Sequence, residues 1–210
     1  NEKIIKNEVE DLIMLQEALH EKKISDIADQ IKSLNKRIIL ICGPSSSGKT
    51  TFAKRLCIQL RVIGLKPLYL GTDDYFVERH ETPLDKNGEK DFESIHAVDL
   101  NLFNQQMNDL LNGKKVDLPR FDFIEGTKIY GERIVSIDKN QPIVIEGIHA
   151  FLIEITLRLR KHKRLTDCSV CSDISNVRTS IQAIPPSATE YHPAAIATPT
   201  MVALYTGTIP

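Results

Sequence analysis

The chain has 210 residues, of which 41% are hydrophobic and 26% are charged, as in an ordinary globular protein. This balance excludes collagen-like, low-complexity and wholly disordered chains. The formal net charge is only −1, so no global basic field favours nucleic acid or an anionic membrane as a partner. No apolar run reaches the roughly 18 residues that span a bilayer. The sequence therefore predicts a cytoplasmic protein that binds neither a membrane nor nucleic acid.

Residues 1–36 are predicted to form an N-terminal helical extension. Apolar residues recur at roughly helical spacing among charged ones between Ile13 and Leu34. This pattern favours one or two amphipathic helices that end near Asn35.

Residues 37–165 carry alternating strand and helix patterns. The expected elements are a strand at 37–42, a helix at 50–62 with Gly64 as C-cap, a strand at 67–70, a helix at 96–112, a hairpin strand at 128–137 and a strand at 142–145. Apart from Arg37, the first and last of these strands are apolar, which is typical of strands buried on both faces. The alternation predicts an α/β fold with a parallel sheet flanked by helices.

Residues 166–210 have a different composition. They contain only four charged residues, several prolines and no sustained helical period. We expect an irregular tail of loops, short strands or poorly packed chain.

The strongest motif is Gly43-Pro-Ser-Ser-Ser-Gly48-Lys49-Thr50, which matches the phosphate-loop pattern G-x-x-x-x-G-K-[ST] in full. It follows an apolar strand and opens a helix, where backbone N–H groups and the helix dipole attract phosphate oxygens. Lys49 is expected at the β- and γ-phosphates, and the Thr50 hydroxyl at Mg²⁺. The residues predicted to bind ATP or GTP are Gly43, Pro44, Ser45, Ser46, Ser47, Gly48, Lys49, Thr50 and Thr51.

Acidic residues follow two of the predicted strands. Glu146 ends the apolar strand at 142–145, and Asp73 and Asp74 come just after the strand at 67–70. The carboxyl ends of neighbouring parallel strands face one crevice. Glu146 is therefore a candidate Mg²⁺ contact. Asp73 and Asp74 are equal candidates for the base that accepts a proton from an acceptor hydroxyl.

Five motifs in this order resemble the uridine kinase and phosphoribulokinase group of P-loop kinases. They are GPSSSGKTTFAKRL, TDDYF, DFES, VDLPRFDF and QPIVIEGIHA. The resemblance covers about residues 10–150, and the C-terminal part does not match. It implies a P-loop kinase core at 37–165 that uses ATP and Mg²⁺ to phosphorylate the 5′-hydroxyl of a nucleoside, with 166–210 as an atypical tail.

The resemblance also implies roles for single residues. Asp73 matches the general base, and Glu146 the acid linked to Mg²⁺. Glu93 falls where the family places an acid near the ribose hydroxyls, and Phe121 where an aromatic ring stacks on the base. From the residues alone, Phe121 could instead be hairpin core, Glu93 a solvated charge, and Arg120 either a phosphate contact or a turn cap.

Two stretches depart from the family pattern. Ile124-Glu125-Gly126 occupies the place of a base-reading histidine, which leaves the acceptor open. Residues 166–210 are not expected to supply the arginine-rich lid, so any basic lid contact would come from 158–164. The alternatives are a kinase of a sugar phosphate or another small alcohol, or a nucleotide-binding module without kinase activity. Association into a homo-oligomer stays open.

Overall fold

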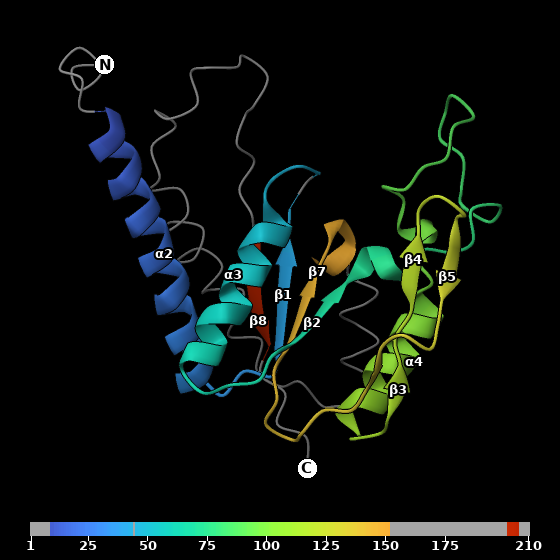
Figure 1. Cartoon of the computed structure of the whole chain (residues 1–210). Helices are drawn as coiled ribbons and strands as arrows, with labels where there is room; N and C mark the ends of the chain where they lie inside the picture. Colours follow the sequence, from blue (N-terminus) through green and yellow to red (C-terminus); the bar gives the residue numbers. More distant parts are fainter. Residues whose placement is uncertain (1–8, 44, 152–200, 206–210) are drawn as a thin grey trace.

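The computed structural model describes residues 9–43, 45–151 and 201–205. Its central sheet has the strand order β2-β7-β1-β8 (Figure 1). The bounds are Leu68–Gly71 for β2, Ile143–Glu146 for β7, Ile38–Cys42 for β1 and Met201–Tyr205 for β8. The first three strands are parallel, as predicted, and β8 adds an antiparallel edge along β1.

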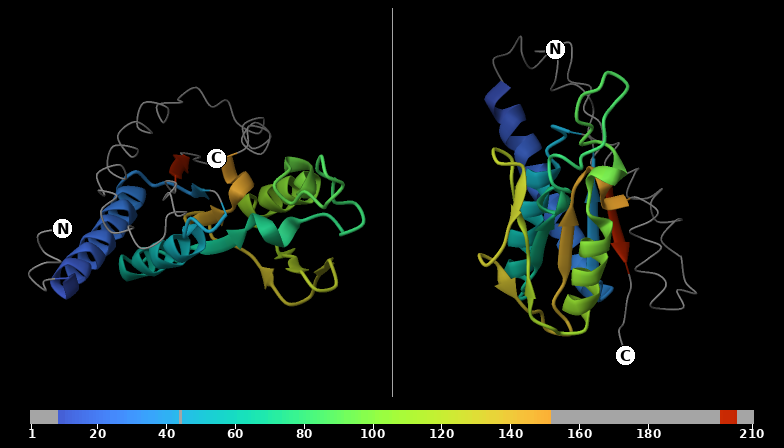
Figure 2. Two further views of the ribbon diagram at one scale, coloured as in Figure 1. Left: turned by 90° about the horizontal axis from the view of Figure 1, so that it is seen from above. Right: turned by 90° about the vertical axis from the view of Figure 1, so that its right-hand side faces the viewer.

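Helices cover both faces of this sheet, with α2 and α3 on one side and α4 on the other (Figure 2). They span Val9–Ser33, Lys49–Val62 and Leu100–Leu111. Alternation along β1 explains the two layers, because Ile39 and Ile41 pack with α2 and α3 while Leu40 packs with α4. A strand buried on both faces must be apolar throughout.

The two N-terminal helices end where the sequence indicated. A single helix, α2, ends at Ser33, and Asn35 follows in the left-handed region at φ 47°. Helix α3 ends at Val62, and Gly64 adopts φ 88° just beyond its C-cap. The C-cap is thus Ile63 rather than the predicted Gly64, which follows it in a left-handed conformation that glycine tolerates without steric cost.

The predicted helix at 96–112 begins later than expected, at Leu100. A separate 3₁₀ turn, η2, spans Ile95–Ala97. Asp99 sets the boundary because its Oδ1 accepts a hydrogen bond of 3.0 Å from the Leu102 backbone N–H. An N-cap side chain of this kind satisfies a donor that has no partner within the helix.

The predicted single hairpin strand at 128–137 was wrong. Two short strands replace it, and each pairs with a different partner. β5 (Thr127–Ile129) pairs with β4 (Arg120–Asp122), and β6 (Ile134–Val135) pairs with β3 (Val116–Asp117). Gly131 separates them at φ 88°, and its N–H donates to the Asp117 carboxylate at 2.8 and 3.0 Å.

The predicted tail is described only in part. Residues 201–205 form the short strand β8, while the remainder of 166–210 and the basic residues at 158–164 lie outside the described residues. None of the helices in the described ranges combines the length and apolar character that a membrane crossing requires.

Helix α2 packs on α3, which suggests a matched pair of variants. Ile24 is fully buried between α2 and α3, whereas Ile13 on the same helix is 53% exposed. We expect Ile24→Ala to lower the free energy of unfolding by about 2–5 kcal/mol. Ile13→Ala should change it by about 0.5 kcal/mol or less. Urea unfolding measures both values, and equal losses would contradict the packing of α2 on α3.

Candidate active site

The phosphate loop joins the end of β1 to the start of α3. Gly48, the N-cap of α3, has φ 79° and ψ 10°, a left-handed conformation that glycine adopts without strain. The loop leaves Ser45, Ser46 and Thr50 exposed, while Lys49 is only 8% exposed. The N-terminus of α3 thus forms an anion-binding end of the predicted kind. Pro44 lies outside the described residues.

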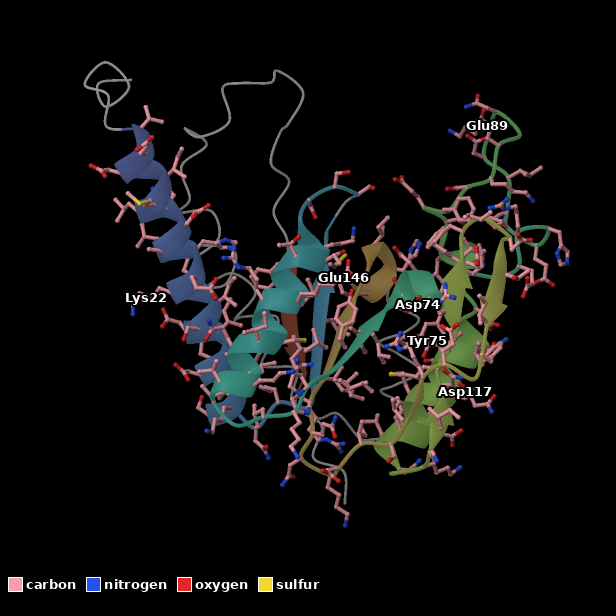
Figure 3. All side chains as sticks on the ribbon, viewed as in Figure 1. Lys22, Asp74, Tyr75, Glu89, Asp117 and Glu146 are labelled. Atoms are coloured by element: carbon pink, nitrogen blue, oxygen red, sulfur yellow. The ribbon has the colours of Figure 1, made fainter. Side chains whose placement is uncertain are left out.

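The sheet brings Glu146 to this loop. In the parallel register, Glu146 at the end of β7 lies opposite Ile41 on β1 and Gly71 on β2 (Figure 3). Its Oε1 is 4.0 Å from Lys49 Nζ, and its Oε2 accepts a hydrogen bond of 3.0 Å from the Tyr69 hydroxyl. The carboxylate is therefore held between β2 and the phosphate loop.

The environment of Glu146 is unfavourable for a lone negative charge. Burial raises the pKa of its carboxyl, and the charge of Asp73 adds to the rise. The hydrogen bond from Tyr69, the charge of Lys49 and a hydrogen bond from the Thr50 side chain oppose this rise in pKa. A cation bound beside Glu146 would offset the cost of burying the charge.

Glu146 and Thr50 fit a magnesium ion. Both offer oxygen atoms, and the Thr50 side chain lowers the pKa of the Glu146 carboxyl. Mg²⁺ commonly takes one or two protein ligands together with phosphate oxygens and water. Within the described ranges there is no cluster of three or more side chains that could ligate a metal by themselves.

The neighbouring acids Asp73 and Asp74 have different surroundings. Both lie in the 3₁₀ turn η1 (Thr72–Tyr75), directly after β2. Asp74 Oδ2 forms an ion pair of 3.0 Å with Arg133 Nη1, and its Oδ1 accepts a hydrogen bond of 3.4 Å from the Phe121 N–H. Asp74 is thus bonded to Arg133 and to strand β4, which carries Phe121.

Asp73 interacts with the phosphate loop instead. Burial raises the pKa of its carboxyl, and the charges of Lys49 and His149 oppose this rise. The charge of Asp74 raises it further. Of the two acids, Asp73 is the one whose pKa is lowered by the charge of Lys49, and its own charge raises the pKa of Glu146.

A close backbone contact joins η1 to the end of β7. A Cβ atom added to Gly147 would lie 1.7 Å from Thr72 Oγ1 and 2.8 Å from Thr72 Cβ. Thr72 is itself fully buried. Only glycine fits at this position, and the contact keeps Asp73 and Glu146 near each other.

The predicted acceptor residues lie farther from the phosphate loop. Phe121 is only 3% exposed and packs edge-to-face on Phe76 and Phe123, so it belongs to the hairpin core. The ring with an exposed face is Phe123, at 57%. Arg120 is exposed, and its Nε forms an ion pair of 2.8 Å with Glu132.

Sequence reasoning missed several residues of this site. The Tyr69 hydroxyl bonds to Glu146, Arg133 bonds to Asp74, and His149 bonds to the Phe92 carbonyl. Each pair is far apart in the sequence, and spacing carries no signal of such contacts. The one signal in the sequence was Gly147, because a glycine directly after Glu146 allows another segment to pack closely against the backbone.

The family model described as "Phosphoribulokinase / Uridine kinase family" matches residues 38–182. The chain belongs to this family. The match continues past residue 150, where the shared motifs were expected to end. A kinase of this family is a P-loop enzyme, which agrees with the loop and strand ends described above.

Individual relatives support the same assignment. A uridine kinase of Mycoplasma genitalium is 32% identical over 126 residues, 60% of this chain and 58% of that protein. A uridine kinase of Ligilactobacillus salivarius is 30% identical over 115 residues, 54% of this chain and 52% of that protein. The chain thus spans about half the length of the curated relatives it matches.

A solved structure shows the same fold. A possible uridine kinase from Bacillus stearothermophilus has a TM-score of 0.52 and 25% identity, with 63% of this chain and 73% of that chain covered. The parallel strands, the phosphate loop and the flanking helices are therefore those of a P-loop kinase.

The contrast between the two acids yields a stability prediction. The pKa of Asp73 is raised above its ordinary value of 3.8, so the folded protein holds this proton more tightly than the unfolded chain. Stability contributed by the neutral acid is lost as pH rises through the raised pKa. We expect Asp73→Asn to increase the free energy of unfolding at pH 7, and this gain to vanish below pH 3.8.

Asp74→Asn is the matched control for that variant. It removes the charge that pairs with Arg133 and should lower the free energy of unfolding by about 1–2 kcal/mol at pH 7. Urea unfolding between pH 3 and pH 8 compares the two variants. A loss of stability in Asp73→Asn at pH 7 would contradict the buried, repelled carboxylate.

Proposed function

We propose that this protein transfers the γ-phosphoryl group of ATP to the 5′-hydroxyl of a nucleoside. The observation that carries the proposal is the meeting of Lys49, Glu146 and Asp73 beside the N-terminus of α3. A cation, a buried metal-type ligand and a second carboxylate at a phosphate loop are the groups that phosphoryl transfer needs.

Each residue has a distinct role in this proposal. The backbone N–H groups of the loop and Lys49 bind the phosphates and orient them. Thr50 and Glu146 would hold Mg²⁺, which supplies charge neutralisation of the phosphate oxygens. Asp73 accepts the proton of the attacking hydroxyl, for which it must be ionised. Lys49 and His149 favour that ionised state.

A nucleoside is the acceptor that the relatives favour, since those described above are named uridine kinases. Glu93 is exposed next to Phe92, where a ribose hydroxyl could donate to it. Phe123 offers an exposed ring to a base.

One observation favours a second acceptor class, a sugar phosphate or other small alcohol. Phe121 was expected to stack on the base, yet it is 3% exposed within the core. An acceptor without a nucleobase would not need that ring. Nucleosides and small alcohols should therefore be compared in one assay.

Turnover tests the proposal directly. ADP release from Mg²⁺ and ATP is measured with uridine, cytidine, adenosine, glycerate and ribose 5-phosphate as acceptors. We expect release to depend on a nucleoside, and Asp73→Asn to lower kcat by about 10²–10⁴ with little change in the KM for ATP. Lys49→Ala should lose most nucleotide affinity, whereas Lys54→Ala, on the exposed side of α3, should behave as the parent. ATP binding without release for any acceptor would indicate a nucleotide-binding module.

Tyr69 provides a test of the magnesium assignment. Tyr69→Phe removes the hydroxyl that bonds to Glu146, so the pKa of Glu146 rises and the carboxylate binds a cation less well. We expect a several-fold increase in the Mg²⁺ concentration that half-saturates binding of a non-hydrolysable ATP analogue. Tyr75→Phe removes a more deeply buried hydroxyl, which bonds to Gln106 at 2.9 Å, and should leave this concentration unchanged. Equal shifts in both variants would argue against Glu146 as a ligand.

A further inference from the structure

His149 is a buried titratable side chain that the scheme above uses only through its charge. It lies in the 3₁₀ turn η3 (Ile148–Phe151), which follows β7 after Gly147, and it is 2% exposed. Its Nε2 is 3.2 Å from the backbone carbonyl oxygen of Phe92. The contact joins two segments separated by 57 residues.

The partner decides which ring nitrogen of His149 carries a proton. A carbonyl oxygen only accepts hydrogen bonds, so Nε2 must be protonated and must donate. Loss of this donor would leave the part-buried carbonyl of Phe92 without that partner, which costs stability.

The segment that receives this bond is a compact turn. Asp91 Oδ1 accepts hydrogen bonds from the backbone N–H groups of Glu93 at 3.0 Å and Ser94 at 3.1 Å. These bonds determine the local shape of the turn but not its place relative to the sheet. The Phe92 ring packs on Phe76 at 5.3 Å, a non-directional contact that permits sliding. The directional link to the end of β7 is the hydrogen bond from His149.

His149 also acts on the other side of the site. A His149 ring protonated on both nitrogens would lower the pKa of Asp73 and favour its ionised form. One buried ring therefore interacts with the base of the proposed reaction and with the backbone next to Glu93.

We propose that His149 is a positioning residue for the acceptor. It attaches the turn that carries Glu93 to the end of β7, so that Glu93 and Asp73 keep a set separation. The inference rests on the proposed function, because it assigns acceptor binding to the side of the site that Glu93 occupies. It predicts that acceptor affinity depends on whether the side chain at residue 149 is long enough to bond to the Phe92 carbonyl, and not only on whether that side chain is polar.

Two amide variants separate reach from polarity. The amide nitrogen of His149→Gln can occupy the place of Nε2 and donate to the Phe92 carbonyl, whereas the shorter side chain of His149→Asn cannot reach it. His96→Asn, at an exposed position in the neighbouring 3₁₀ turn, is the control for a histidine lost nearby.

Hydrogen exchange of backbone amides tests whether the turn is held in place, and it does not depend on enzyme activity. The backbone amides of Asp91, Ser94 and Ala97 are hydrogen-bonded and serve as reporters. We expect them to exchange about tenfold faster in His149→Asn, as for the loss of one buried hydrogen bond. They should exchange within about threefold of the parent rate in His149→Gln and His96→Asn.

Kinetics with uridine and ATP test the consequence for the acceptor. His149→Asn should raise the KM for uridine about tenfold and leave the KM for ATP within about twofold, and His149→Gln should restore the parent value. The inference is overturned if the Asn and Gln variants behave alike, or if both KM values rise together. If the parent protein uses none of the acceptors, the proposed function fails, while hydrogen exchange still decides whether His149 holds the turn.

Discussion

The register of β7 between β1 and β2 is the constraint on which the site depends. Because all three strands run parallel, their carboxyl ends lie at one edge of the sheet. The phosphate loop follows β1, Glu146 ends β7, and Asp73 follows β2. A shift of β7 by one residue would turn Glu146 to the opposite face of the sheet. The apolar strands, covered by helices on both faces, oppose such a shift because each residue has a buried place.

The carboxyl-terminal edge of the sheet carries several charged side chains that are largely shielded from water. Glu146 is 5% exposed and Lys49 8% exposed, while Asp73 is half-buried beside them. Burial raises the pKa of both carboxyls, and the charge of Asp73 adds to the rise at Glu146. The protein therefore maintains negative charge at a cost to stability, which is common at functional sites. A bound cation and a phosphate chain would complete the charge balance.

Strand β4 and Arg133 are attached to this edge of the sheet by hydrogen bonds and an ion pair. Asp74 holds Arg133 and the backbone of Phe121, and Arg133 also donates to the Tyr69 carbonyl at 3.0 Å. Tyr69 in turn bonds to Glu146. The acceptor side and the metal side are thus connected through β2, so Asp74 serves the structure while its neighbour Asp73 is left to the proposed chemistry.

The sequence by itself determined the parallel α/β core, the phosphate loop and the helices on either side of the loop. These features depend on local conformation and on the period of burial, which neighbouring residues encode. It also placed Glu146 and the two acids at strand ends. Only the tertiary structure gave Asp73 and Asp74 different surroundings, placed Phe121 in the core, divided 128–137 at Gly131 and brought His149 to Phe92. Each of these outcomes depends on a partner from a distant segment, and the spacing of residues along a chain does not specify which distant groups will meet.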